Sequence, residues 1–151
     1  MTITGTRFGT IDFEEADVIE FVDGLIGFPG LRQFVIITHD AASPFRWLQS
    51  LDEAGMALLL ADPGPLVSEY APIIAESTAG DLGLGAESAA LVFTTANIPL
   101  GKPNEMTLNL MAPIIINPHN RQAKQVVLED AAYTMKHRVF PQDQPVAQAA
   151  A

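Results

Sequence analysis

The residues of this chain best suited to chemistry are its histidines and carboxylates, and their spacing matches no known metal-binding motif. The three histidines are His39, His119 and His137. None has a second histidine or an acid at a spacing such as H-E-x-x-H. Because the chain has no cysteine, a zinc site would need these histidines and distant acids to meet in the fold. The sequence therefore predicts no metal site.

Motifs for phosphate binding, nucleophilic attack and acid–base catalysis are also missing from the sequence. Gly83-Leu84-Gly85 lacks the third glycine and the preceding strand of a dinucleotide fingerprint. No G-x-S-x-G elbow and no P-loop occurs. Paired acids such as Asp52-Glu53 and Glu14-Glu15 are adjacent, so on a strand they would point to opposite faces. We predict no catalytic residue and no cofactor, while carboxylates brought together only by the fold stay an open alternative.

Carboxylates are instead concentrated in one run of sequence near the start of the chain. Residues 12–23 hold six acids interleaved with apolar residues, among them Asp12, Glu14, Glu15 and Asp17. A charge run of this kind is typical of a solvated strand edge or loop. The functional alternative is an electrostatic surface that attracts a basic protein partner.

The composition limits the classes of partner that this chain can bind. Eight lysines and arginines against 18 aspartates and glutamates give a net charge of −10. Direct nucleic-acid binding and binding to an anionic membrane surface both need clustered cations, so we expect neither. No stretch resembles a signal peptide or a membrane-spanning helix, and the predicted location is the cytoplasm. A length of 151 residues fits one domain.

The elements that must position these residues are predicted to be short strands. Alternating or β-branched runs predict strands at 2–8, 18–22, 34–38, 45–49, 56–61, 91–95, 106–110 and 114–116. The triple isoleucine run at 114–116 is predicted to be buried on both faces. Segments 126–128 and 133–139 are predicted to pair as a hairpin around residues 129–132. About nine short strands separated by turns favour an all-β barrel or sandwich.

Less regular segments separate the strands. Residues 69–75 are expected to be extended, and residues 77–83 to form a short helical turn that Ser77 caps. A glycine-rich break over residues 23–30 places Leu25, Ile26 and Phe28 in a loop. Residues 1–141 are predicted to form one domain, and residues 142–151 a frayed tail.

Three segments together resemble the FliW family of flagellar assembly factors. They are F-V-D-G-L-I-G-F-P-G-L at 21–31, P-F-R-W-L-Q-S at 44–50 and M-T-L-N-L-M-A-P-I-I-I-N at 106–117. Shorter matches run from Arg7-Phe8-Gly9 to Tyr133 and His137, so the resemblance spans about residues 3–140. The chain departs from the family pattern at Ala123, where glycine is frequent, and at Lys136, where arginine is common.

The resemblance implies a small, single-domain, cytoplasmic β-barrel-like protein of mostly antiparallel strands and without enzymatic activity. It implies two protein partners, the RNA-binding translational repressor CsrA and flagellin. Binding CsrA would relieve its block on flagellin synthesis, and free flagellin would compete for the factor, which would couple flagellin translation to export. We expect the free protein to be monomeric. The alternative function is a small β-barrel that binds a ligand or acts as an enzyme through carboxylates not identifiable from sequence.

The candidate partner-binding residues fall into four groups. The acids Asp12, Glu14, Glu15 and Asp17 are the basis for electrostatic attraction of CsrA. Leu25, Ile26 and Phe28 lie in the glycine-rich loop, where packing and partner contact are equally open. Trp47 is the only tryptophan, and its type favours a core anchor, with an interface anchor as the alternative. Glu69 and Tyr70 are expected at the edge of a turn, with packing or binding open for Tyr70.

Overall fold

The computed structural model describes residues 1–85, 89–130 and 132–140 of the chain. These residues form short strands, one α-helix and two 3-10 turns. The elements are β1 (Thr2–Thr6), β2 (Gly9–Asp12), η1 (Glu15–Asp17), β3 (Ile19–Phe21), β4 (Gln33–Ile37), β5 (Phe45–Ser50), β6 (Ala57–Ala61), α1 (Glu76–Leu82), β7 (Leu91–Asn97), η2 (Pro103–Glu105), β8 (Thr107–Leu108), β9 (Ile114–Asn117), β10 (Gln122–Gln125) and β11 (His137–Arg138). The predicted all-β class is confirmed.

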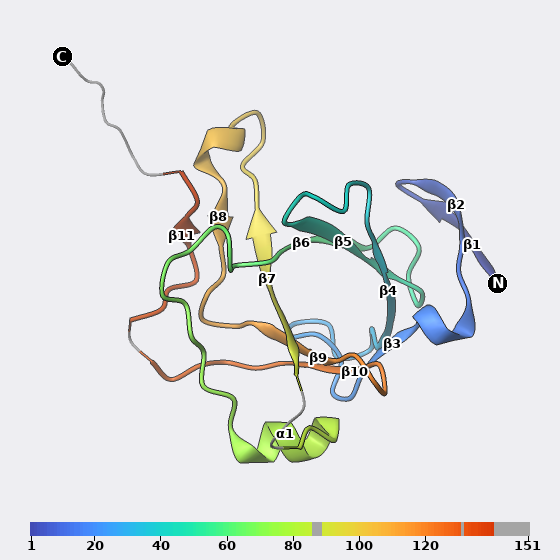
Figure 1. Ribbon diagram of the computed structural model, residues 1–151. Coiled ribbons are helices and arrows are strands. Elements are labelled where there is room, and N and C mark those ends of the chain that lie inside the picture. The colour runs from blue at the N-terminus through green and yellow to red at the C-terminus, as the bar shows by residue number, and fades with distance from the viewer. Residues whose placement is uncertain (86–88, 131, 141–151) are drawn as a thin grey trace.

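Seven of the strands close into a barrel. Their order is β7-β6-β5-β4-β3-β10-β9, and β9 pairs again with β7 to complete the ring (Figure 1). Every pairing in the ring is antiparallel except that of β3 with β10, which is parallel. Closure removes the exposed sheet edges that an open sheet of this size would present. The predicted barrel of mostly antiparallel strands is therefore confirmed.

The barrel interior is filled by side chains that alternate along the strands. Ile19 and Phe21 of β3, Leu48 of β5 and Leu60 of β6 are fully buried in one cluster with residues of β4, β9 and β10. The rings of Phe21 and Phe34 meet edge-on at 5.1 Å between centroids. Strand side chains alternate between two faces, so every second residue of these strands points into the barrel.

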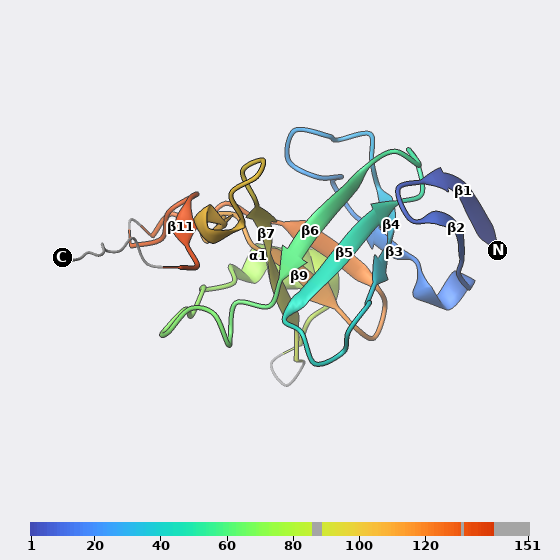
Figure 2. The ribbon, with the colours of Figure 1, turned by 90° about the horizontal axis from the view of Figure 1, so that it is seen from above.

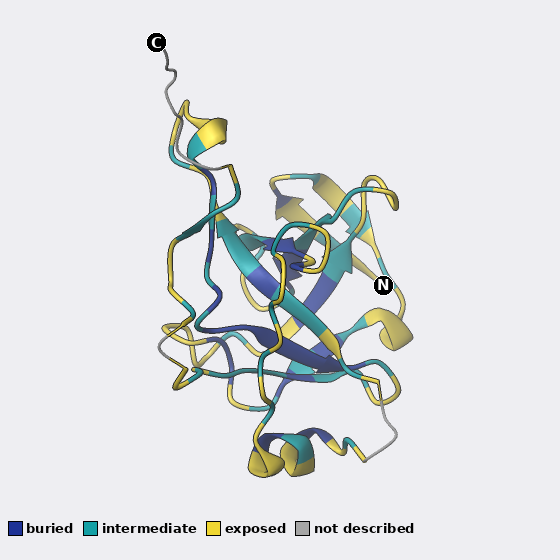
Figure 3. Ribbon diagram, turned by 60° about the vertical axis from the view of Figure 1, so that its left-hand side comes forward, coloured by how far each residue is buried: buried dark blue, intermediate teal, exposed yellow. Residues whose placement is uncertain are grey.

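The isoleucine run of β9 is buried on both faces, as predicted. Ile114 and Ile116 join the interior cluster, and Ile115 is also fully buried although its side chain lies on the opposite face of β9. Figures 1 and 3 place α1 beyond this outer face of β9 and β10. Asn117, the last residue of β9, donates from its amide to the carbonyl of Leu82 at 2.8 Å, so the end of α1 is fixed to the barrel.

The segment after β10 differs from the predicted hairpin. Residues 126–128 form no strand; instead the amides of Val126 and Leu128 donate to the carbonyls of Pro113 and Met111. Of 133–139 only β11 is a strand, and it pairs with β8 rather than with its neighbour in sequence. The hairpin prediction was wrong because a long-range partner was available for each segment, and local alternation does not report such partners.

Smaller differences affect the helix and the strap before it. The residue that precedes α1 is Ala75, not Ser77, which lies inside the helix, so the predicted cap was wrong. Residues 66–75 form a strap with no strand of its own, and Figures 1 and 2 show it crossing the outside of the barrel between β6 and α1. The predicted tail at 142–151 lies outside the described residues.

The first two strands form a separate two-stranded hairpin on the outside of the barrel (Figure 2). The sequence predicts one strand over residues 2–8, but the chain reverses after Thr6 and Thr6 pairs with Gly9. The Thr6 hydroxyl donates to the carbonyl of Gly9 at 2.6 Å and accepts from the amide of Phe8 at 3.0 Å. These two bonds close the turn and place Arg7 and Phe8 against β5.

The buried position of Ile115 gives a test of the fold. In Ile115→Asp an unpaired carboxylate would be buried, which costs several kcal/mol. Because a domain of this kind is stable by only ~5–15 kcal/mol, we expect the variant to be largely unfolded by circular dichroism. Ile115→Ala should fold and lose about 2–5 kcal/mol in urea denaturation. An aspartate variant that melts at the wild-type temperature would show that this side chain reaches water.

Candidate partner-binding surfaces

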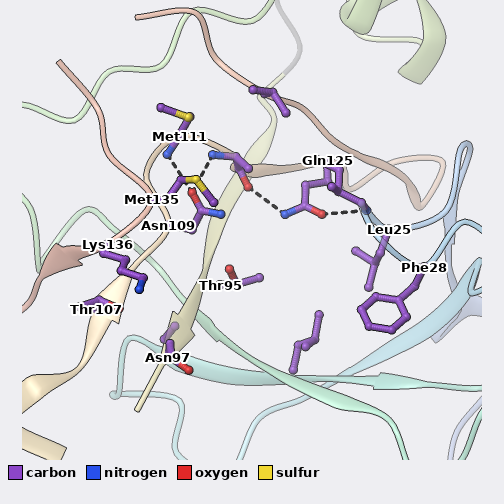
Figure 4. A pocket seen from close by; sticks show the side chains of 15 residues that line it. Leu25, Phe28, Thr95, Asn97, Thr107, Asn109, Met111, Gln125, Met135 and Lys136 are labelled. Carbon is purple, nitrogen blue, oxygen red and sulfur yellow. Dashed lines mark hydrogen bonds between the residues drawn. The ribbon is translucent and has the colours of Figure 1, made fainter. Parts of the chain in front are cut away.

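An open groove of about 470 Å³ lies at the end of the barrel where β6, β7 and β10 meet the glycine-rich loop. We refer to it as the apolar groove. Figure 4 shows Leu25 and Phe28 along one side of it and Thr107 and Lys136 along the other. Its lining residues are Leu25, Ile26, Phe28, Leu58, Thr95, Ala96, Asn97, Thr107, Asn109, Met111, Ala112, Gln125, Val127, Met135 and Lys136.

The loop that forms one side of the groove is a tight turn fixed by two glycines. The amide of Phe28 donates to the carbonyl of Leu25 at 2.8 Å, and the amide of Leu25 donates back at 3.3 Å. Gly27 takes a φ of +88°, which a side chain would oppose at this position of a turn. Gly24 takes a φ of +72°, and a Cβ there would collide with the backbone of Pro29. Glycine at these two positions therefore determines the path of the loop.

Gln125 at the end of β10 fastens this loop to the barrel. Its Oε1 accepts from the amide of Ile26 at 3.1 Å, and its Nε2 donates to the carbonyl of Ala112 at 3.1 Å. Asn109 acts similarly on the opposite side, since its Oδ1 accepts from the amides of Met111 and Ala112. Figure 4 shows both sets of bonds. The side-chain amides of Gln125 and Asn109 thus help to shape the groove. Because they are bonded within the protein, a partner would bond to other polar residues of the lining.

The structure separates the three loop candidates into one core residue and two exposed residues. Leu25 is 2% exposed and belongs to the interior cluster, whereas Ile26 is 51% and Phe28 48% exposed. Large apolar side chains that stay half exposed at the rim of a groove are a usual mark of a binding surface. Of the three, Ile26 and Phe28 are therefore the residues accessible to a partner.

The predicted acidic run separates into two parts. Asp12, Glu14, Glu15 and Asp17 are exposed around η1, and we call these four the acidic turn. The ion pairs within the described residues involve none of them. The other two acids of the run are paired, Glu20 with Arg32 at 3.8 Å and Asp23 with Lys124 at 3.4 Å. The uncompensated negative charge of the run is therefore confined to the acidic turn.

Trp47 lies on the outer face of β5 and is not part of the core, contrary to the favoured expectation. It is half-buried, while its neighbour Leu48 is fully buried in the interior. The guanidinium of Arg7 lies over the indole, 4.4 Å from the ring centroid, and the ring of Phe8 meets it edge-on at 5.5 Å. The β1–β2 hairpin thus covers much of Trp47, because alternation along β5 directs this side chain outward.

Tyr70 holds the strap against the barrel. Its hydroxyl donates to the carbonyl of Leu110 at 2.7 Å, and its ring packs edge-on against Tyr133 at 4.7 Å. The hydroxyl of Tyr133 in turn accepts from the amide of Ala71. Burial, and then the nearby Tyr133, raise the pKa of Tyr70 to about 12. Glu69 beside it is exposed with a φ of +63°. Packing therefore accounts for Tyr70.

Sequence reasoning missed most of the residues that form the apolar groove. Asn97, Thr107 and Lys136 lie far apart in the sequence and meet only because β7 pairs with β8 and β8 with β11. Gln125 bonds to a residue 99 positions away. Local sequence patterns do not show which distant strands pair. Alternation along β7 does predict that Thr95 and Asn97 lie on the same face of that strand.

The histidines are not brought together. The ring of His39 lies 5.4 Å from that of Phe8 at the β1–β2 hairpin, tilted by 55°, and His137 lies in β11 at the other end of the molecule (Figure 2). In the described ranges, no three histidines or acids are grouped so that they could hold a metal ion. Nor does any helix there have the length and apolarity that a membrane crossing requires.

Comparison with known proteins now identifies the family. The sequence model of the FliW protein family matches residues 2–139. The chain belongs to the FliW family. The flagellar assembly factor FliW of Desulfitobacterium hafniense (strain Y51) is 38% identical to it over 140 residues, which cover 93% of this chain and 91% of that relative.

Other FliW proteins agree in sequence and in structure. The flagellar assembly factor FliW of Magnetococcus marinus is 36% identical over 141 residues, covering 93% of this chain and 86% of the relative. A crystal structure of the flagellar assembly factor FliW superposes with a TM-score of 0.85 at 30% identity, covering 93% of this chain and 98% of that chain. The closed barrel described above is thus the FliW fold.

The role of Gly24 in this FliW chain can be tested by a single methyl group. Gly24→Ala should destabilise the loop by about 1–3 kcal/mol, because alanine resists a positive φ and its Cβ would meet Pro29. Gly30→Ala is the matched control, since a Cβ there would meet nothing within 4 Å. Thermal melts of Gly24→Ala and Gly30→Ala would measure the difference. Equal melting temperatures would show that Gly24 is not required for the path of the loop.

Tyr70 gives a pH-dependent test. Its pKa is about 12 in the folded protein against 10.0 ordinarily, so the folded state holds the phenolic proton more tightly. The resulting stability is complete below pH 10 and is lost as the pH rises toward 12. Tyr70→Phe should cost about 1 kcal/mol at neutral pH through the lost hydrogen bond, and its stability should fall less steeply above pH 10.

Urea denaturation of both proteins at a series of alkaline pH values would measure this difference. The pKa of Lys124 is also raised, by its hydrogen bond to Asp81, so both proteins should lose some stability at high pH. Curves that stay parallel between wild type and Tyr70→Phe would show that Tyr70 ionises equally in the folded and unfolded states.

Proposed function

We propose that this protein is a cytoplasmic flagellar assembly factor that binds the RNA-binding repressor CsrA and flagellin. By binding CsrA it would relieve the block on flagellin translation, and by binding flagellin it would match translation to export. The observation that carries this proposal is membership of the FliW family over residues 2–139, with relatives named flagellar assembly factors. The surface of the molecule supports it in two ways.

The acidic turn supports a basic partner. Its four carboxylates are exposed and take part in no recorded ion pair within the described residues. An RNA-binding protein carries clustered cations, because phosphate binding requires them. Complementary charge accelerates the encounter of two proteins and orients them before contact. We therefore assign the acidic turn to CsrA.

The apolar groove supports protein binding rather than catalysis. Among the described residues its lining contains no carboxylate and no histidine, which are the usual acid–base residues of a catalytic pocket. It contains four apolar side chains that are about half exposed or more, Ile26, Phe28, Val127 and Met135, and a second flexible methionine, Met111. Such surfaces adapt to apolar side chains of a partner. A protein without enzymatic activity fits this surface better than the alternative of a carboxylate enzyme.

Calorimetric titration of the purified chain with CsrA, and separately with flagellin, tests the proposed function. Binding of both proteins, each in its own titration, is the expected result. Size-exclusion chromatography of the free chain should give the mass of a monomer. Failure to bind either protein would refute the proposal.

The acidic turn gives a sharper kinetic test. Replacing Asp12, Glu14, Glu15 and Asp17 by their amides should slow association with CsrA and affect dissociation less. The amides are chosen because Asp17 accepts a hydrogen bond from the amide of Glu14 at 2.9 Å, which asparagine can also accept. Raising the salt from about 0.05 to 0.5 M should slow the wild type in the same way, since screening shortens the reach of charge.

The matched control changes the net charge equally elsewhere. Glutamines at Glu53, Glu76, Glu105 and Glu129 also remove four negative charges but leave the acidic turn intact. Surface plasmon resonance at low salt would compare the three proteins. If both four-fold variants associate equally slowly, only net charge matters; if the acidic-turn variant associates as fast as wild type, CsrA docks elsewhere.

A further inference from the structure

We propose that the apolar groove binds a peptide segment that presents apolar side chains together with a carboxylate. On the proposed function this segment belongs to flagellin, so the inference rests on that function and assigns the two partners to two different surfaces. The acidic turn would serve basic CsrA, and the groove would serve flagellin. The two surfaces share no lining residue.

The groove exists because β6 and β7 separate at this end of the barrel. Their recorded pairs are Leu60 with Thr95 and Ala61 with Thr94. Beyond these pairs, Leu58 of β6 and Asn97 of β7 both line the groove. Asn97 pairs instead with Thr107 of β8, on the other side of β7. A channel therefore opens between two strands that are adjacent in the barrel.

The lining includes the apolar side chains of Leu25, Ile26, Phe28 and Leu58, which we call the apolar wall. Figure 4 shows Leu25 and Phe28 together along one side of the channel. Leu25 is buried and anchors the wall, while Ile26 and Phe28 keep about half of their surface in water. The loop is held in place by Gln125 and by its own turn hydrogen bonds. A wall that is already ordered costs little conformational entropy when a partner binds.

The lining also includes four polar side chains, Thr95, Asn97, Thr107 and Lys136, which we call the polar row. Figure 4 shows Met111 and Met135 near Lys136 on this side. Thr95 and Asn97 lie two residues apart on β7, and Asn97 is directly paired with Thr107. No side-chain hydrogen bond is recorded for these four in the described part of the chain, in contrast to Asn109 and Gln125. The polar row is therefore available to bond a partner.

The charge of the groove indicates which kind of peptide segment would bind in it. The part of its lining that the structure describes contains one charged side chain, Lys136, and no carboxylate, although the whole chain carries 18 acids and a net charge of −10. Lys136 is exposed and forms none of the ion pairs recorded among the described residues. Hydroxyl, amide and ammonium groups all donate to a carboxylate. A basic segment would be repelled by Lys136, whereas an apolar segment with an acidic side chain fits both the apolar wall and the polar row.

Substitution at the exposed apolar positions tests the apolar wall. Ile26→Asp and Phe28→Asp should each weaken flagellin binding about tenfold or more, because each buries a carboxylate against apolar groups of the partner. Both side chains are about half exposed in the free protein, so the variants should fold and keep the circular dichroism spectrum of the wild type. Leu100→Asp is the matched control: Leu100 is 100% exposed, lies outside the groove and should leave binding as it is.

Substitution of Lys136 tests whether the bound segment carries a carboxylate. Lys136→Glu should weaken flagellin binding by about fivefold, and Lys136→Met by less, since glutamate adds repulsion to the loss of attraction. If Lys136→Glu binds flagellin as tightly as wild type or more tightly, the segment carries no carboxylate at this point and that part of the proposal is wrong.

Isothermal titration of each variant with flagellin and with CsrA separates the outcomes. Loss of flagellin binding with CsrA binding retained supports the assignment. If the wild type binds flagellin and Phe28→Asp binds it equally well, the groove assignment fails while the proposed function stands. If the wild type binds no flagellin, the proposed function fails and the groove assignment fails with it. Loss of CsrA alone, or a wild-type dimer that Ile26→Asp dissociates, would assign the groove to CsrA or to a second copy and overturn the proposal.

Discussion

Pairing of β7 with both β9 and β8 is the constraint on which the rest of this structure depends. The first half of β7, Leu91–Phe93, pairs with β9 and closes the barrel; its second half, Ala96–Asn97, pairs with β8 outside the ring. One strand thus completes the core and also starts the extension that carries β8 and β11. Because β7 leaves the ring at this point, the part of β6 that precedes Leu60 has no recorded pair with β7. The apolar groove opens there, beside Leu58.

The interior cluster of the barrel consists of apolar side chains. Backbone groups at the ends of its strands receive their hydrogen bonds from three side-chain amides. Asn117 bonds the end of α1, Gln125 bonds the glycine-rich loop, and Asn109 bonds the turn before β9. Each of these amides lies at the end of a strand or next to one, where backbone groups leave the ladder and would otherwise lack partners. Two of them, Gln125 and Asn109, also line the groove and help to determine its shape.

Two places on the described surface, the acidic turn and the apolar groove, differ in the charge they present. Lys124 on β10 lies 2.8 Å from Asp81 of α1 and 3.4 Å from Asp23, so one cation partly compensates both acids close to the barrel. The acidic turn has no such partner among the described cations, and the groove has a lysine without an acid. Long-range attraction depends on uncompensated charge, so on the proposed function these two places would help to orient a charged partner.

The sequence by itself determined the all-β class, the strands β3 to β7 and β9, and the burial of the isoleucine run, because alternation and β-branching are local signals of a half-buried or buried strand. It also carried the family resemblance and the exposed acids of residues 12–17. It did not predict that Trp47 faces outward under Arg7 and Phe8, or that residues 126–128 form no strand. Only the tertiary structure decided these two features, and only it brought Phe28, Asn97 and Lys136 into one groove. Such contacts join residues tens of positions apart, and they depend on which strand pairs with which, a choice that closure of the barrel makes and that no local pattern contains.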